Sequence, residues 1–319
     1  MKYLIETIRH RLVGTSIKME LKKLVVLTKE DLRISTKSKK LWTFIILMLL
    51  PSVILAIAGV LFFIPENQTS LAFWKTINPH WFVLDRMIDD FKEGMKGLYG
   101  LVVGYWLNLP IVIATAIYTS EFIAGERAKG SFDLFATKPV LRTSLVASKI
   151  IAFAIISLLV SVLVYILLFG VFAMAYFGDI STVLLVLWQS SDIIETYIFV
   201  TWLFVMAVCS ITVFFSSLTK HSLFATFGTL AYLMGYGMGV SLISLFVPGT
   251  LGQLLSEQLS YVNLQTIARI LLSYWLTGEI TSVFQLIEMD STVASISFAL
   301  FIALPMLVAF MIIETRDLL

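Results

Sequence analysis

The sequence alternates long apolar runs with shorter polar and charged stretches. Six of the apolar runs are long enough to cross about 30 Å of hydrocarbon at roughly 1.5 Å of helical rise per residue. They lie near residues 41–63, 98–119, 149–176, 195–217, 222–247 and 293–313. A helix satisfies its backbone hydrogen bonds within one segment, as a lipid environment requires. The pattern therefore predicts an all-α integral membrane protein with six transmembrane helices.

The polar stretch before the first apolar run also has helical periodicity. Residues 1–12 and 17–33 each place apolar side chains on one face and lysine or arginine on the other. Such helices lie on a membrane surface rather than crossing it. We expect residues 1–40 to form an amphipathic elbow and residues 41–319 to form the six-span domain. The alternative is a basic anchor that only sets the topology.

Short helices are expected between the spans. Residues 79–97 carry an apolar stripe after Asn78, and residues 264–275 carry another after Asn263, which are both good helix caps. These patterns predict short outer helices between spans 1 and 2 and between spans 5 and 6. The run 180–188 is too short to cross and is expected to lie at the interface, with Trp188 as an anchor.

Composition indicates that the chain lies in a membrane, and the distribution of charge predicts its orientation there. Hydrophobic residues make up 59% of the chain and charged residues 14%, with a mean hydropathy of +0.93, far from a soluble protein. Segments 1–40, 119–149, 215–223 and 314–319 hold 18 of the 23 Lys and Arg residues. The positive-inside rule therefore predicts a multi-pass protein of the cell membrane with both termini cytoplasmic. A net charge of +2 gives no indication of a nucleic-acid partner.

The stretch from 119 to 149 is the most charged connection between spans. It contains Glu121, Glu126, Arg127, Lys129, Asp133, Lys138, Arg142 and Lys149. A connection between spans needs only a few residues, so this length and helical patterning suggest a surface that a partner contacts. Phe132 and Phe135 offer apolar anchors there, while the charges would set the register. The alternative is that both phenylalanines rest on the bilayer surface.

Catalytic and ion-coupling chemistry is not indicated. The three histidines are scattered and Cys209 is the only cysteine, so no metal-spaced set occurs. The run 125–131 imitates a phosphate loop but lacks lysine after its second glycine. The cores of the six predicted spans contain no Asp, Glu, Lys, Arg or His, unlike most ion-coupled carriers. We therefore expect no enzyme activity in this chain, and expect energy for transport to enter from another subunit.

The 119–149 stretch resembles the signature of ABC-2-type membrane subunits. The matching residues are Glu126-Arg127, Gly130-Ser131, Leu134-Phe135, Lys138-Pro139-Val140, Arg142 and Lys149. The order of parts is also similar, from an amphipathic elbow through six spans to a basic-Asp terminus, here Arg316-Asp317. Ser131 stands where the family usually has threonine.

The resemblance implies a permease that pairs with itself or with a sister permease and docks two separate ATPase subunits. The expected ATPase-coupling surface consists of Glu121, Glu126, Arg127, Gly130, Phe132, Phe135, Pro139 and Arg142. This chain would bind no cofactor, because ATP and Mg²⁺ would belong to the partner. The uncharged, aromatic-rich interior favours amphipathic or lipid-like cargo over free ions, and we expect an exporter.

Two further features concern packing and modification. Gly228, Gly235 and Gly239 give the fifth span a small face, and the last two form a GxxxG, which suits close helix packing within the subunit or across a dimer. Asn67 begins an Asn-Gln-Thr sequence on the predicted outer side, a possible glycosylation site.

Two other classes of protein remain open. A membrane anchor or assembly subunit would keep this topology without a coupling surface. A membrane-embedded lipid-modifying enzyme would need a polar cluster at one membrane face, and Asp85, Asp89 and Asp90 form the only such set. A solvated helix face explains these three aspartates better, because no second acidic cluster completes a metal clamp.

Overall fold

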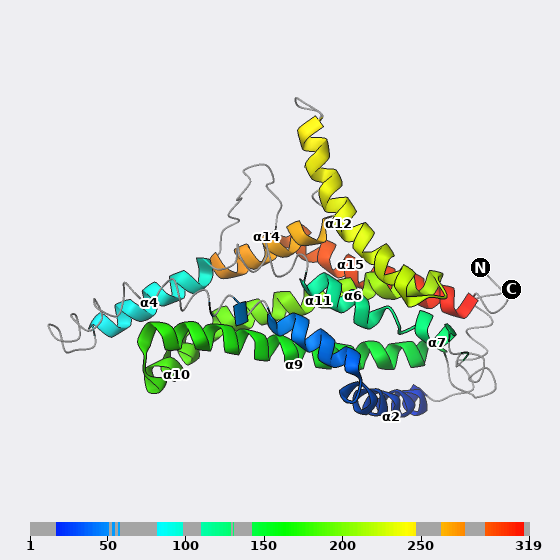
Figure 1. Ribbon diagram of the computed structural model, residues 1–319, viewed down its shortest axis with the longest axis horizontal. Helices are drawn as coiled ribbons and strands as arrows, with labels where there is room; N and C mark the ends of the chain where they lie inside the picture. The colour runs from blue at the N-terminus through cyan, green and yellow to red at the C-terminus, as the bar shows by residue number, and fades with distance from the viewer. Residues whose placement is uncertain are drawn as a thin grey trace.

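The computed structural model describes residues 17–50, 53–54, 57, 82–97, 110–128, 130, 142–246, 263–277 and 291–315. Within these ranges every regular element is a helix (Figure 1). The helices are α2 (Ile17–Thr36), α4 (Phe82–Gly97), α6 (Pro110–Thr119), α7 (Ala124–Ala128), α9 (Arg142–Phe177), α10 (Ile180–Gln189), α11 (Ser191–Leu218), α12 (Ser222–Phe246), α14 (Leu264–Thr277) and α15 (Ser291–Thr315). Residues 39–50 are also helical. The predicted all-α class is confirmed for this part of the chain.

Among the residues that the structure describes, three helices are long and apolar enough to cross a membrane. They are Thr143–Phe177, Ser191–Leu218 and Ser291–Thr315, which match the third, fourth and sixth predicted spans. The chain is therefore a multi-pass membrane protein. α12 corresponds to the fifth predicted span, and α6 to the end of the second. The count of six spans stays a prediction, because the first two are described only in part.

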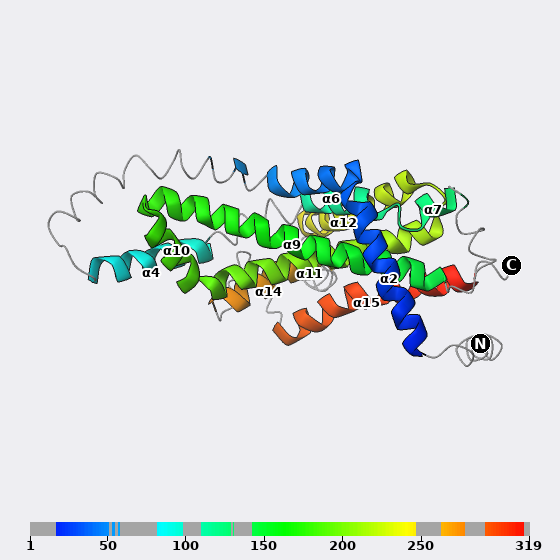
Figure 2. The same ribbon diagram turned by 90° about the horizontal axis from the view of Figure 1, so that it is seen from below.

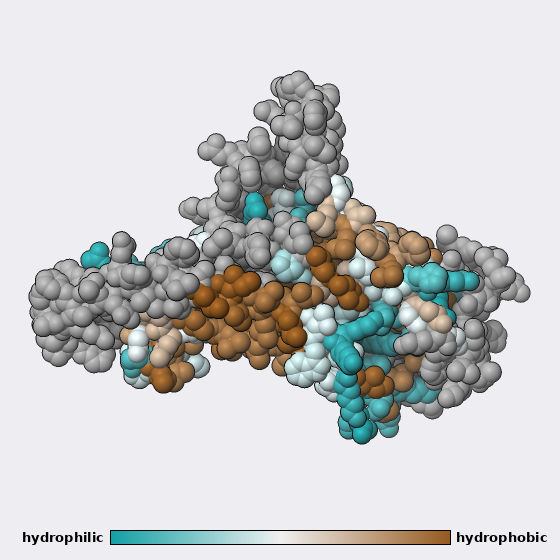
Figure 3. Space-filling model, in the orientation of Figure 1, coloured by the Kyte–Doolittle hydropathy of each residue, from teal (hydrophilic) through white to brown (hydrophobic). Residues whose placement is uncertain are grey.

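The helices form an elongated bundle with two different ends (Figures 1 and 2). α2, α7, the N-terminal end of α9 and the C-terminal ends of α11 and α15 lie together, and we call this the basic end. α4 and α10 lie at the opposite end. Figure 3 shows a brown apolar zone over the middle of the molecule and teal hydrophilic residues around α2.

α2 lies in the segment predicted to form the elbow and packs against α9, while its role as a membrane-surface elbow stays a prediction. Thr28 is buried, whereas Val25 and Val26 are exposed. The helix ends at Thr36, and a tight turn follows in which the Lys37 N–H donates to the Ile34 carbonyl at 3.1 Å. Helical structure resumes at residue 39, so the elbow and the next helix are separated close to the predicted boundary at residue 40.

Local sequence sets the sharp reversal between α9 and α10. Gly178 has φ of 76°, a left-handed conformation that glycine adopts without steric cost. The Asp179 carboxylate then accepts the N–H groups of Ser181 and Thr182, each at 3.1 Å, and so caps α10. The run 180–188 forms most of α10 and the side chain of Trp188 is exposed, while its place at the membrane interface stays a prediction.

The short helices predicted between spans are present where the structure describes them. α4 buries Ile88, Phe91 and Met95, which belong to the predicted stripe. The Tyr197 hydroxyl of α11 donates to the Met95 carbonyl at 2.8 Å and holds α4 on the bundle. α14 is capped by Asn263, whose Oδ1 accepts the Gln265 N–H at 3.0 Å.

Hydroxyl and indole groups make the polar contacts between the apolar helices. Tyr165 and Thr201 share a hydrogen bond of 2.6 Å, and the Trp202 indole donates to the Ala154 carbonyl at 2.9 Å. Ser210 donates to the Ile302 carbonyl of α15 at 2.6 Å. Pro305 lies inside α15 and cannot donate to the carbonyl four residues before it, so this part of the helix is weakened. Ser210 supports α15 at that point.

Candidate functional site

The candidate site lies at the basic end, where the predicted coupling stretch begins. α6 ends at Thr119, residues 120–123 form a turn, and α7 follows over Ala124–Ala128. α9 begins at Arg142, several residues before the predicted start at 149. Arg142 and Lys149 therefore belong to a membrane-spanning helix and not to the connecting loop. The physical reason is that polar residues such as Thr143 and Ser144 lower the hydropathy without breaking the helix.

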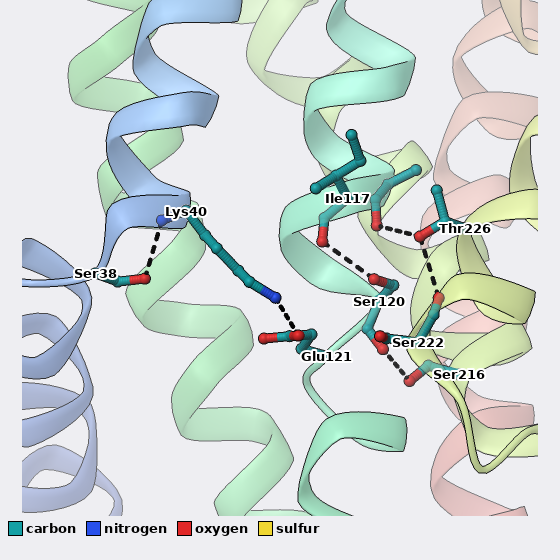
Figure 4. Close-up of polar contacts among 9 residues, drawn as sticks. Ser38, Lys40, Ile117, Ser120, Glu121, Ser216, Ser222 and Thr226 are labelled. Carbon is teal, nitrogen blue, oxygen red and sulfur yellow. Dashed lines mark hydrogen bonds and ion pairs between the residues drawn. The ribbon is translucent and has the colours of Figure 1, made fainter. Parts of the chain in front are cut away.

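One serine of α11 fixes the turn before α7. Ser216 Oγ donates to the Ser120 carbonyl at 2.7 Å, as Figure 4 shows, and accepts the Ala124 N–H at 2.9 Å. Ser216, Ser120 and Ala124 are all buried. A single hydroxyl thus satisfies backbone groups at both ends of the turn, and it locates α7 against α11.

Two charged side chains of α7 extend these connections. Glu126 pairs with Lys149 of α9 at 2.6 Å, and the two side chains are 28% and 23% exposed. Arg127 Nη1 donates to the Ser217 carbonyl at 2.6 Å. That carbonyl belongs to the last turn of α11, where carbonyls lack helical partners and a cation is favourable. α7 is therefore held by two different spanning helices.

A third connection reaches the helix over residues 39–50. Lys40 forms an ion pair with Glu121 of the turn, as drawn in Figure 4. The Lys40 and Glu121 side chains are 48% and 34% exposed, and solvent-accessible pairs add little stability. Their value here is geometric, because they connect the turn to a segment about 80 residues earlier in the chain.

The elbow helix is tied to the same region. Ser148 Oγ of α9 donates to Asp31 Oδ2 at 2.5 Å. Burial raises the pKa of the Asp31 carboxyl, although the hydrogen bond from Ser148 and the charge of Lys149 act in the opposite direction. Ser148 directly precedes Lys149 on α9. Asp31, which is bonded to Ser148, therefore lies close to the Glu126–Lys149 pair. The elbow and α7 therefore contact adjacent positions of α9.

Aromatic side chains support the turn from within the bundle. Phe44, Tyr118, Phe122 and Phe153 form what we call the aromatic cluster. The Phe153 ring of α9 lies 5.3 Å from the rings of Phe44 and Tyr118 and 6.1 Å from Phe122. Edge and offset contacts at these separations are favourable. Three segments meet on Phe153, whose side chain is fully buried.

Two glycines, one in the first turn of α7 and one just after its end, have structural reasons for their small size. Gly130 has φ of 68°, and its N–H donates to the Arg127 carbonyl at 3.0 Å, an arrangement that ends a helix. A Cβ at Gly125 would lie 3.0 Å from the Glu121 Cβ, so the turn approaches α7 closely. Gly130 was predicted in the coupling surface, and the structure shows a conformational reason for glycine there.

The other predicted residues are placed as follows. Gly228 of α12 faces the Phe215 ring, which an added Cβ would meet at 2.9 Å, so its small size serves packing within the subunit. Gly235 has no atom within 4 Å of such a Cβ, and Gly239 lies further along α12. Phe132, Phe135, Pro139 and Asn67 lie outside the described residues.

We expect the Glu126→Gln variant to lose about 1 kcal/mol of free energy of unfolding, because Lys149 would keep its charge in a partly buried place without its partner. Unfolding of the purified protein by a denaturing detergent would measure the loss. Glu93→Gln is the matched control, since Glu93 pairs with Lys96 at 2.8 Å but is 72% exposed. Equal stabilities for the two variants would contradict the prediction, as would failure of Glu126→Lys with Lys149→Glu to recover stability.

Sequence reasoning missed Asp31, Ser148, Ser216 and Ser217. Ser216 and Ser217 end the apolar run of α11, and adjacent hydroxyl residues at the end of a span were a usable signal. The sequence around Asp31 and Ser148 contains no comparable signal, because the pairing of these two residues depends on how α2 crosses α9. Among the described residues no group of three His, Cys, Asp or Glu side chains could hold a metal ion.

Comparison with known proteins gives one family. The model for "ABC-2 family transporter protein" matches residues 25–318. A search of curated proteins found no match to the chain.

Proposed function

Because the chain belongs to the ABC-2 transporter family, we propose that it is a permease subunit energised by a separate ATPase, which docks on the 119–149 stretch. The observation that carries this proposal is the way α7 is held. Its two charged residues and the preceding turn are bonded to α9, α11 and the helix over residues 39–50. A force applied to α7 would reach all three at once.

The proposed coupling follows from these contacts. A partner that pulls or tilts α7 moves Glu126 and Arg127, and with them the ends of α9 and α11. The hydrogen bonds of Ser216 to both sides of the turn keep α7 from sliding independently. Such contiguous contacts between rigid helices are what mechanical coupling requires. ATP and Mg²⁺ are bound by the partner in this scheme.

The proposed cargo is amphipathic or lipid-like and is exported. In the described parts of α9, α11 and α15, the buried polar residues are serine and threonine, joined by tyrosine hydroxyls. Such an interior offers neutral hydrogen-bonding groups and no fixed charge to an ion. We further propose six spans, a cytoplasmic basic end, two ATPase subunits and pairing with a second permease, each motivated by the sequence pattern and the family.

We expect transport to require ATP and to survive loss of ion gradients. The test uses proteoliposomes that contain this chain and its co-expressed ATPase, with a fluorescent lipid analogue as cargo. Added ATP should drive movement of the analogue, and an ionophore should leave the rate unchanged. Movement that ignores ATP but stops with the ionophore would refute the proposal. If the ATPase fails to copurify, the chain is an anchor or assembly subunit instead.

A further inference from the structure

An apolar groove opens between three helices in the half of the bundle nearer the basic end. Its volume is about 510 Å³. α11 contributes Phe214 and Phe215, α12 contributes Tyr232, and α15 contributes Leu300, Leu304 and Pro305. None of the residues that hold α7, such as Lys149, Ser216 and Ser217, lines the groove.

The sequence accounts for the groove. Gly228 lets α12 approach the Phe215 ring closely near the start of α12. Beyond that contact α12 leaves the bundle, as Figure 1 shows. Pro305 interrupts the backbone bonding of α15 opposite this divergence. The space between the diverging α12 and α15 is not filled by another described side chain, and it remains as the groove.

The surroundings of the groove select an uncharged occupant. No ionisable carboxylate, amine or imidazole is among the described residues that line it. Two of its walls, α11 and α15, are helices suited to crossing a membrane. Leu300 and Leu304 on its rim are 54% and 58% exposed, so the groove opens sideways towards the space that lipid hydrocarbon would fill.

The position of the groove and the charge near its end indicate where the acyl chain and the headgroup of a bound lipid would lie. Phe214 and Phe215 are in the last turn of α11, which ends at Leu218. Lys220 and His221 follow immediately and are exposed. An apolar chain in the groove would therefore have its polar end beside a cationic lysine.

The volume of the groove suits a single hydrocarbon chain better than a helix from a second copy of the chain. A helix with side chains is roughly 10–12 Å across and rises about 5.4 Å per turn, so one turn fills about 400–600 Å³. The groove could take only one such turn. A single flexible hydrocarbon chain fits without this restriction, since small-molecule sites of roughly 300–1,000 Å³ are common.

From this geometry we infer that the groove binds one acyl chain of a phospholipid from the leaflet at the basic end, with its phosphate beside Lys220. The inference does not depend on the ATPase or on transport. It concerns a lipid-binding site on the flank of the bundle.

The test uses the purified full chain in liposomes that contain a trace of phosphatidylglycerol with a diazirine on one acyl chain. After irradiation, mass spectrometry locates the labelled residues. We expect labels concentrated at Phe214, Leu300 and Leu304. Leu300→Trp and Leu304→Trp should each lower labelling of the groove about tenfold, because an indole takes much of the space.

Matched controls exist on the same helix. Ile296 and Leu307 are 57% and 62% exposed and do not line the groove, so Ile296→Trp and Leu307→Trp should leave its labelling unchanged. Lys220→Ala should weaken labelling by phosphatidylglycerol more than by phosphatidylcholine. Even labelling along all exposed positions of α15, or cross-linking of Leu304→Cys between two copies, would overturn the inference. Neither outcome bears on ATP-driven transport.

Discussion

The Phe153→Ala variant is expected to lose about 3 kcal/mol of free energy of unfolding. Phe153 is fully buried and contacts Phe44, Tyr118 and Phe122 from three other segments. Removing its ring leaves a cavity that these separate helices cannot all close. Within a membrane the loss comes mainly from packing, since lipid is as apolar as the protein interior. Detergent-induced unfolding of the purified protein would measure it.

Leu159→Ala on the same helix provides the control. Leu159 is 64% exposed, so its truncation should change the free energy of unfolding by less than about 0.5 kcal/mol. A Phe153→Ala protein as stable as this control would show that the aromatic cluster does not join α6, α9 and the helix over residues 39–50. Phe153→Leu should recover part of the stability by filling some of the volume.

Phe132→Ala and Phe135→Ala are each expected to weaken association with the proposed ATPase by about 2 kcal/mol, or roughly thirtyfold. The reason is that large apolar anchors dominate protein interfaces, whereas rim charges contribute less. Titration of the purified ATPase into nanodiscs that contain each variant would measure the affinity.

Lys129→Ala is the comparison for the two phenylalanine variants, because a charge at the rim typically costs less than a buried anchor. Membrane insertion must be confirmed for every variant before affinities are compared. If both phenylalanine variants bind and stimulate the ATPase like the parent protein, the stretch is not the coupling surface. Contact with the bilayer surface would then be the role of these side chains.

Hydropathy and periodicity were sufficient to predict the helices that bury a continuous stripe or cross the membrane. α11 and α15 match their predicted spans within a few residues. Ile88, Phe91 and Met95 were assigned to the buried face of α4 from spacing alone, and they are buried. These properties are local, so a short window of sequence contains the information.

The contacts that hold α7 could not be predicted in the same way. The Arg127 bond to Ser217 and the Ser216 bond to Ser120 join residues 90 or more positions apart. Each bond depends on how the helices pack in space. From the sequence alone, several serines near the ends of spans were equally good candidates for these bonds. The start of α9 was placed too late for another reason, since hydropathy marks where a helix becomes apolar and not where it begins.

The separation of Arg127 from its acceptor also has a consequence for biogenesis. A ribosome adds roughly 5–20 residues per second, so the 90 residues between Arg127 and Ser217 take about 5–18 s to make. During that interval α7 exists without the carbonyl that fixes its arginine and without the serine that fixes its turn. A nascent chain can therefore form the contacts between α7 and α11 only after α11 has been synthesised. Partner capture in the proposed complex would then require a chain made at least as far as Ser217, so chains that end before α11 would not be assembled.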